Sequence, residues 1–175
     1  MHHFVRGLLL LVVLLFTGCA AIGPAFTPAP DEAGNGILYV YRGTNKAFGA
    51  RSAYFYVNDI NVFDLDRNGY SWVSLPSGTY KVTQKWPIDI MTKSIETTIE
   101  IRAGEARYIS FDTGFCQGGF GTICMSWVLR QENKDKAMWQ ITDKKFQPNF
   151  GLEKLKAAIR TSAKGVASPG EPPRD

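Results

Sequence analysis

Three cysteines and a few closely spaced acidic residues are the side chains of this sequence best suited to chemistry. The cysteines are Cys19, Cys116 and Cys124. Both histidines, His2 and His3, lie in a leader at the start of the chain. Once the leader is removed, no imidazole remains, which excludes Ser-His-Asp and Cys-His catalysis and histidine-ligated metal sites. We therefore expect a protein that is not an enzyme, with no cofactor and no metal.

The leader is organised like a secretory signal. Arg6 supplies a positive charge, residues 8–16 are an unbroken apolar run, and small residues follow up to Cys19. The apolar run is about half as long as the roughly 20 residues of a membrane-spanning helix. A cleaved signal peptide over residues 1–18 is therefore favoured over a transmembrane anchor.

The residues at the cleavage point resemble the lipobox of bacterial lipoproteins, and they read Leu15-Phe16-Thr17-Gly18-Cys19. The resemblance implies that Cys19 becomes the first residue and carries the diacylglyceryl and palmitate chains that hold the protein at a membrane. Ala20 rather than Asp follows, which in such lipoproteins implies the outer membrane, and we expect the protein to face the periplasm. The alternative is an ordinary signal peptide that contains a cysteine by coincidence.

Cys116 and Cys124 flank a glycine-rich stretch at residues 117–123. With Cys19 used for lipidation, an even number of cysteines remains in an oxidising compartment, which predicts a disulfide between them. Glycine permits a tight loop between the two sulfurs. The glycines match neither the P-loop nor the dinucleotide-binding pattern. The alternative is two free thiols.

The charge of the chain argues against a nucleic-acid partner. There are 20 Lys and Arg against 16 Asp and Glu, a net charge of +4. The basic residues are scattered along the sequence, whereas nucleic-acid binding usually needs a basic stripe or patch.

Most of the chain alternates polar and apolar residues with period two, which predicts an all-β domain over residues 36–161. Short strands separated by Asn-Gly and Pro-Ser-Gly turns indicate an antiparallel, immunoglobulin-like or transthyretin-like β-sandwich of 7–9 strands. The expected strands are 37–42, 53–58, 61–66, 70–75, 79–86, 93–102, 107–113, 123–132 and a short one at 138–143. A helix is expected over 152–160, a flexible Pro-rich tether over 19–35, and a disordered tail over 162–175.

Tyrosine and tryptophan alternate with aliphatic residues in three of these strands. If the Leu, Val and Phe residues form the core between the sheets, the aromatic residues line an outer face. Rings with polar tips suit sugar stacking or a protein interface. The possible ligand platform consists of Tyr39, Tyr41, Tyr54, Tyr56, Tyr70 and Trp72. The alternatives are that the helix over 152–160 covers these residues, or that they form the core.

Asp64, Asp66 and Asn68 match the first half of a calcium loop. The second half fails, because Leu75 stands where the bidentate Glu belongs, so a plain hairpin turn is favoured over a weak calcium site. Two carboxylates on one side of a strand could also serve a glycosidase. Such spacing is common on strand surfaces, and it occurs at Asp64 with Asp66 and at Glu96 with Glu100.

Four segments resemble a family of small bacterial lipoproteins with an uncharacterised domain. They are the opening strand 36–42, the hairpin 56–59, the Asn-Gly-Tyr turn at 68–70 and the Leu-Pro-Ser-Gly-Thr-Tyr turn at 75–80. The resemblance extends over residues 37–130 and implies a sandwich fold without assigning catalytic residues. We expect a lipid-anchored envelope protein with an interaction or structural role, whose partner is an envelope protein or peptidoglycan. The alternatives are a carbohydrate-binding module and an assembly lipoprotein of a secretion system.

Overall fold

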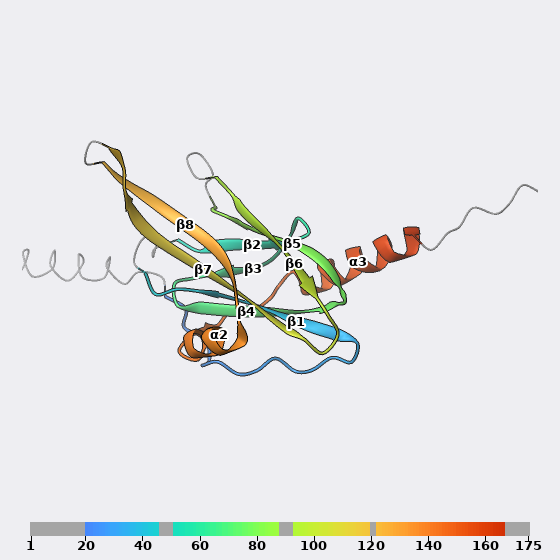
Figure 1. Cartoon of the computed structure of the whole chain (residues 1–175). Helices are drawn as coiled ribbons and strands as arrows, with labels where there is room; N and C mark the ends of the chain where they lie inside the picture. Colours follow the sequence, from blue (N-terminus) through green and yellow to red (C-terminus); the bar gives the residue numbers. More distant parts are fainter. Residues whose placement is uncertain (1–19, 46–50, 88–92, 120–121, 167–175) are drawn as a thin grey trace, which may run out of the picture.

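The computed structural model describes residues 20–45, 51–87, 93–119 and 122–166. Within these ranges nine strands form two sheets that pack face to face (Figure 1). One sheet has five strands in the order β8-β7-β1-β4-β9, and the other has four in the order β3-β2-β5-β6. The predicted all-β sandwich with a C-terminal helix is therefore confirmed.

Most elements fall within a few residues of the ranges expected from the alternating pattern. Asn58 and Asp59, both with positive φ, close the first hairpin, between β2 and β3. The bounds are β1 Asn35–Arg42, β2 Ala53–Val57, β3 Ile60–Leu65, β4 Gly69–Pro76, β5 Gly78–Lys85, β6 Ile95–Ile101, β7 Ala106–Gln117, β8 Ile123–Glu132, α2 Lys134–Ile141, β9 Lys145–Phe146 and α3 Leu152–Val166.

A helix stands where a strand was predicted over 138–143. The Asn133 side chain accepts a hydrogen bond from the Lys136 N–H at the start of α2, which is a normal N-cap. Ala137 and Ile141, one helical turn apart, are both fully buried, so the segment buries a helical face. At the other end of the chain, α3 continues to Val166, so the predicted tail begins at least five residues too early.

Two strand pairs are parallel, which the short connections did not predict. β1 pairs with β7 in parallel from Ile37–Ala106 to Arg42–Phe111. β4 pairs with β9 in parallel at Gly69–Lys145. Short turns specify antiparallel neighbours, whereas these pairs join segments that are far apart in the sequence.

The core between the sheets is the aliphatic and phenylalanine set expected from the alternation. Leu38, Val73 and Phe55 have no exposed surface. The Phe55 ring lies 5.6 Å from that of Phe63 and 5.5 Å from that of Phe111, which joins both sheets through one aromatic group.

Arg42 is a charged residue in this interior, with 1% of its surface exposed. Its Nη1 donates hydrogen bonds to the carbonyl oxygens of Arg51 at 2.6 Å and Leu65 at 2.9 Å. The guanidinium also lies 5.5 Å from the ring centre of Trp86 and 5.8 Å from that of Phe111. Burial lowers the pKa of Arg42 to about 10. One side chain thus ties the end of β1 to the neighbouring sheet.

Residues 20–34, here called the N-terminal segment, pack along the outer face of the five-stranded sheet (Figure 1). Ala20 forms a β-bridge with Arg67. The Phe146 N–H donates to the Pro24 carbonyl at 2.8 Å, and the Phe26 ring lies 5.2 Å from that of Tyr70. The prediction of a flexible tether over 19–35 is therefore wrong for residues 20–34.

The far end of the N-terminal segment is held by α3. The Lys156 ammonium lies 3.2 Å from the Glu32 carboxylate, which also accepts a hydrogen bond from Ser74. Hydrogen bonds from Ser74 and Lys156 lower the pKa of Glu32.

Cys19 and the predicted signal peptide lie outside the described residues. None of the described helices is long and apolar enough to cross a membrane.

Candidate binding site

A polar cleft of about 620 Å³ lies between α2, the end of β1, the middle of β7 and Arg130 of β8. Trp139 stands at its edge with 81% of its surface exposed. The position follows from the helix, because Ala137 and Ile141 bury the face that packs on the sheet. The indole is thus held out beside a polar hollow by a short capped helix.

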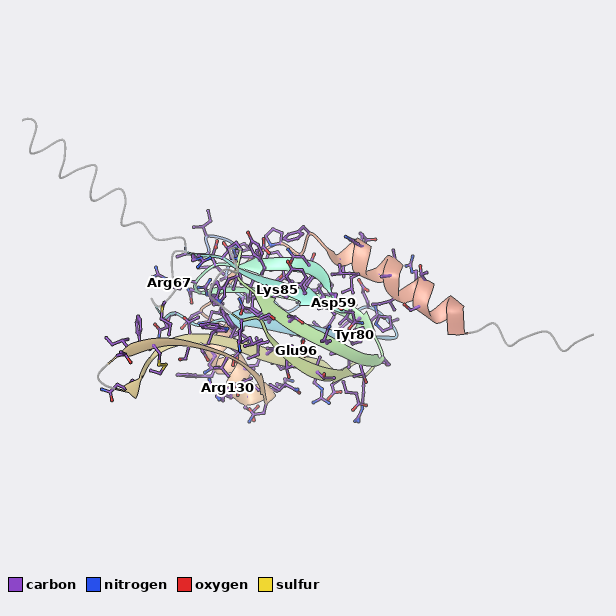
Figure 2. All side chains as sticks on the ribbon, turned by 90° about the horizontal axis from the view of Figure 1, so that it is seen from above. Asp59, Arg67, Tyr80, Lys85, Glu96 and Arg130 are labelled. Atoms are coloured by element: carbon purple, nitrogen blue, oxygen red, sulfur yellow. A yellow bond between two sulfur atoms is a disulfide. The ribbon has the colours of Figure 1, made fainter. Side chains whose placement is uncertain are left out.

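An ion pair forms one wall of the cleft. The Arg130 guanidinium of β8 lies 3.3 Å from the Asp112 carboxylate of β7, and both side chains are about half exposed. Figure 2 shows Arg130 on the side of the molecule that carries α2. The pair offers a fixed donor and a fixed acceptor to a ligand.

The base of the cleft is formed by Tyr41 of β1. Its hydroxyl donates to the Gln140 side chain at 2.7 Å. Burial, followed by the nearby negative charge of Glu132, raises the pKa of Tyr41. Tyr41 therefore stays a neutral hydroxyl at neutral pH.

Lys144 completes the cleft and is 7% exposed. Its ammonium donates to the Asn68 Oδ1 at 3.2 Å. Burial lowers the pKa of Lys144, and the charge of Asp143 opposes this shift. The lysine therefore links the cleft to the turn between β3 and β4.

That turn contains the residues considered for calcium, and donors of the protein engage each of them. Asp66 accepts hydrogen bonds from Ser52 at 2.6 Å and Gln147 at 3.0 Å. The Lys144 ammonium lies against Asn68, where a calcium ion would compete with it. Asn61 donates to Asp64 at 3.3 Å, and burial raises the pKa of Asp64 while this hydrogen bond opposes the shift.

The turn therefore joins β3 and β4 to the segment around β9, and we discard the calcium interpretation. Among the residues that the structure describes, no group of three or more His, Cys, Asp and Glu is arranged to hold a metal.

The six aromatic residues considered as a ligand platform do not form one exposed surface. Tyr39, Tyr41 and Tyr70 lie on the outer face of the five-stranded sheet, as expected, but are at most 5% exposed. The N-terminal segment and α2 cover them, rather than α3. Trp72 is half-buried in the same layer, whereas Tyr54 and Tyr56 lie half-buried on the other sheet.

The predicted disulfide is confirmed. Cys116 and Cys124 are bonded, with their Cα atoms 5.0 Å apart, and they are directly opposite residues of β7 and β8. Of the paired carboxylates considered for a glycosidase, Glu96 and Glu100 are exposed, and Glu100 forms an ion pair with Arg102 at 3.1 Å. Asp64 and Asp66 are partly buried and accept the hydrogen bonds described above.

The sequence did not single out Trp139, Asp112 or Arg130 as site residues. The one local signal was Asn133 followed by three helix-compatible residues, which marks a helix start and would have turned Trp139 outward. Asp112 and Arg130 can be predicted as neighbours only when the register of β7 and β8 is known. The disulfide sets this register by placing Cys116 opposite Cys124.

The fold defines a two-sheet β-sandwich with an attached helix and an open polar cleft. Residues 32–120 match the family described as "Protein of unknown function (DUF2846)", and the chain belongs to that family. The match begins in the N-terminal segment and includes β1 to β7, whereas β8, α2 and α3 lie beyond it. No curated protein matches the chain.

Proposed function

We propose that this protein is a lipid-anchored, non-enzymatic binding protein of the bacterial cell envelope, held through Cys19 at the periplasmic face of the outer membrane. The lipobox-like residues 15–19 and the Ala20 that follows them support the anchor and the address. The N-terminal segment supports a close attachment, because Ala20, the residue after Cys19, is bridged to Arg67 of the folded domain.

The observation that carries the binding role is the cleft beside Trp139. An exposed indole gives a flat apolar surface on which a sugar ring stacks, while nearby polar groups hydrogen-bond the sugar hydroxyls. Asp112 and Arg130 supply an acceptor and donors next to that surface. We therefore favour a glycan of the envelope, such as the sugar backbone of peptidoglycan, as the ligand.

The state of Tyr41 and of the Asp112–Arg130 pair supports binding rather than proton transfer. A general acid or base works best with a pKa near the operating pH. Burial instead raises the pKa of Tyr41, and its hydroxyl is committed to Gln140. Asp112 is paired with Arg130, so both are suited to hold a ligand in place.

The anchor is tested by the mass of the N-terminal peptide of the chain purified from its cells. The expected peptide begins at Cys19 and carries acyl chains. A peptide that begins elsewhere, or one that begins at Cys19 without lipid, would contradict the anchor. Ala20→Asp should move the protein from the outer to the inner membrane fraction, and an unchanged distribution would contradict the proposed address.

The cleft is tested by binding of the purified chain to peptidoglycan sacculi. Trp139→Ala should weaken binding by about tenfold, the effect of losing about 1.4 kcal/mol at a central aromatic contact. Phe150→Ala is the matched control, because Phe150 is also an exposed aromatic residue but does not line the cleft. Equal binding by the two variants, or no binding by the unsubstituted chain, would contradict the glycan proposal.

A further inference from the structure

β7 and β8 form an arm that projects beyond the rest of the five-stranded sheet. β7 pairs with β1 only as far as Phe111, opposite Arg42. β7 then continues through Gln117, paired throughout with β8. Six residues at about 3.3 Å each extend the arm by about 20 Å. Figure 1 shows this hairpin standing clear of the sandwich, and we call residues 112–117 and 123–128 the arm.

The tip of the arm carries large apolar side chains that the protein leaves exposed. Phe115 is 66% exposed and Met125, directly opposite it, is 53% exposed. Ile123, the first residue of β8, is 76% exposed. Opposite residues of a hairpin share a face, so these three side chains lie on one face of the tip. An apolar group of this kind marks an interaction site.

The disulfide lies on the opposite face of the tip and does not cover these apolar side chains. Cys116 and Cys124 lie between these apolar positions in sequence, so their side chains point to the opposite face of the hairpin. The covalent link keeps the two strands of the tip in register. The apolar side chains therefore remain presented together without support from the rest of the sandwich.

The chain enters the folded domain at the same end. Ala20 bridges to Arg67, which lies in the turn between β3 and β4. Tyr70, the second residue of β4, pairs with Tyr41 near the end of β1. The arm extends from this end of the sheet. Figure 2 shows Arg67 at the arm end of the molecule, away from α3. Cys19 is covalently bound to Ala20, so its Cα lies about 3.8 Å from that of Ala20.

From this juxtaposition we propose that the tip of the arm inserts into the surface of the bilayer to which Cys19 is anchored, as a second membrane contact. The proposal rests on the proposed lipidation of Cys19. Because the anchor is the residue before Ala20, it holds the arm end close to the lipid surface. There Phe115, Ile123 and Met125 move from water into the boundary between headgroups and acyl chains.

One further residue fits this occupant. Ile22, two residues after Ala20, is 97% exposed and so adds an apolar side chain close to the anchor. Trp127, at the base of the arm, packs on the core and on Trp86 and donates from Nε1 to the Lys93 carbonyl at 3.1 Å, so it joins the arm to the sandwich.

The test uses the full chain purified as its cells process it and reconstituted into vesicles of phosphatidylethanolamine and phosphatidylglycerol. An environment-sensitive fluorescent amino acid replaces Ile123 in one sample and Ser162, an exposed residue of α3, in the other. The probe at 123 should emit further to the blue, and lipids with brominated chains should quench it several-fold more than the probe at 162. Equal quenching, with both probes reporting water, would overturn the proposal.

The same preparation separates this proposal from the anchor. The mass of the N-terminal peptide reports lipidation independently of the probe. If the chain carries no lipid, it is added to preformed vesicles. A probe at 123 that still enters the bilayer would then contradict the lipid anchor but not the membrane contact of the arm. If lipid is present and the probe at 123 stays in water, the arm proposal alone fails.

A protein partner is the competing occupant of the tip. A photo-crosslinking amino acid at 123 in cells should yield lipid adducts. A discrete crosslinked protein, together with a probe at 123 that reports water on vesicles, would overturn the membrane contact.

Discussion

The arm end of the sandwich and the end on which α3 packs, here called the helix end, differ in how much apolar side-chain surface they expose. At the helix end, α3 inserts Leu155 into the core, and the adjoining hairpin turn is polar, with Asp59 in an ion pair with Lys81 at 2.9 Å. At the arm end, Arg42 is buried while Phe115 and Ile123 are exposed. Figure 2 shows Asp59 and Arg67 toward opposite ends.

This difference distinguishes the two ends of the molecule and suits a fixed orientation at a membrane surface. At the helix end, α3 covers the core and one large apolar side chain, Phe150, is exposed, whereas the arm end exposes three on one face of the arm, Phe115, Ile123 and Met125. A domain attached to a membrane through the residue before Ala20 would place its polar end away from the lipid.

The largest expected effect comes from the charge buried near the arm end. Arg42→Ala leaves the carbonyls of Arg51 and Leu65 without their donor and opens a cavity, so we expect a loss of about 4 kcal/mol in the free energy of unfolding. Urea denaturation measures it. Arg102→Ala, which removes an exposed arginine, should change stability by less than about 0.5 kcal/mol. Similar values for the two variants would show that Arg42 does not tie the sheets together.

The helix end should respond almost as strongly. Leu155→Ala removes a fully buried side chain of α3, and we expect a loss of about 3 kcal/mol. Ala158→Gly, on the exposed face of the same helix, tests propensity alone and should cost about 1 kcal/mol. If the two losses are equal, α3 does not close this end by packing.

A smaller effect is expected where the N-terminal segment meets β9. A Cβ at Gly23 would lie 1.8 Å from the Phe146 carbonyl oxygen, so Gly23→Ala must push the segment away. We expect a loss of about 2 kcal/mol, with faster hydrogen exchange at the Phe146 amide, which donates to Pro24. Gly119→Ala, where a Cβ meets nothing, is the control. Unchanged exchange at Phe146 would mean that the segment is not held there.

The smallest effect is expected at the ion pair between Glu32 and Lys156. Glu32→Gln should cost about 0.5 kcal/mol at pH 7, since the pair is partly exposed. Because the folded-state pKa of Glu32 is lowered, its contribution is present above pH 4.5 and is lost as the pH falls through the folded pKa. Denaturation at a series of pH values checks this, and a difference that persists or grows at acid pH would contradict it.

Local patterns predicted the strands and the disulfide well. Alternation places side chains on fixed faces, so the inward set that includes Leu38 and Phe55 could be read directly. Once Cys19 was assigned to lipidation on its lipobox-like context, two cysteines remained, and Cys116 could be paired with Cys124. These features depend on periodicity or parity, and both are properties of the sequence alone.

The remaining features depend on contacts between distant segments. Phe26 stands among prolines that suggest a free tether, and contacts with distant residues, such as its packing on Tyr70 and the bridge from Ala20 to Arg67, fix the segment. The cleft draws Tyr41, Asp112 and Trp139 from three elements that are brought together by the parallel pairing of β1 with β7. The outward aromatic face was predicted, but not the layer that covers it.

Energy transfer from the two ends of the protein to the bilayer tests the membrane orientation most directly. The full chain, reconstituted into vesicles with acceptor-labelled headgroups, carries a donor at Thr44, an exposed residue just beyond β1 at the arm end, or at Ser162 of α3. Attachment at the arm end predicts clearly stronger transfer from residue 44 than from residue 162. Equal transfer, or stronger transfer from residue 162, would contradict it.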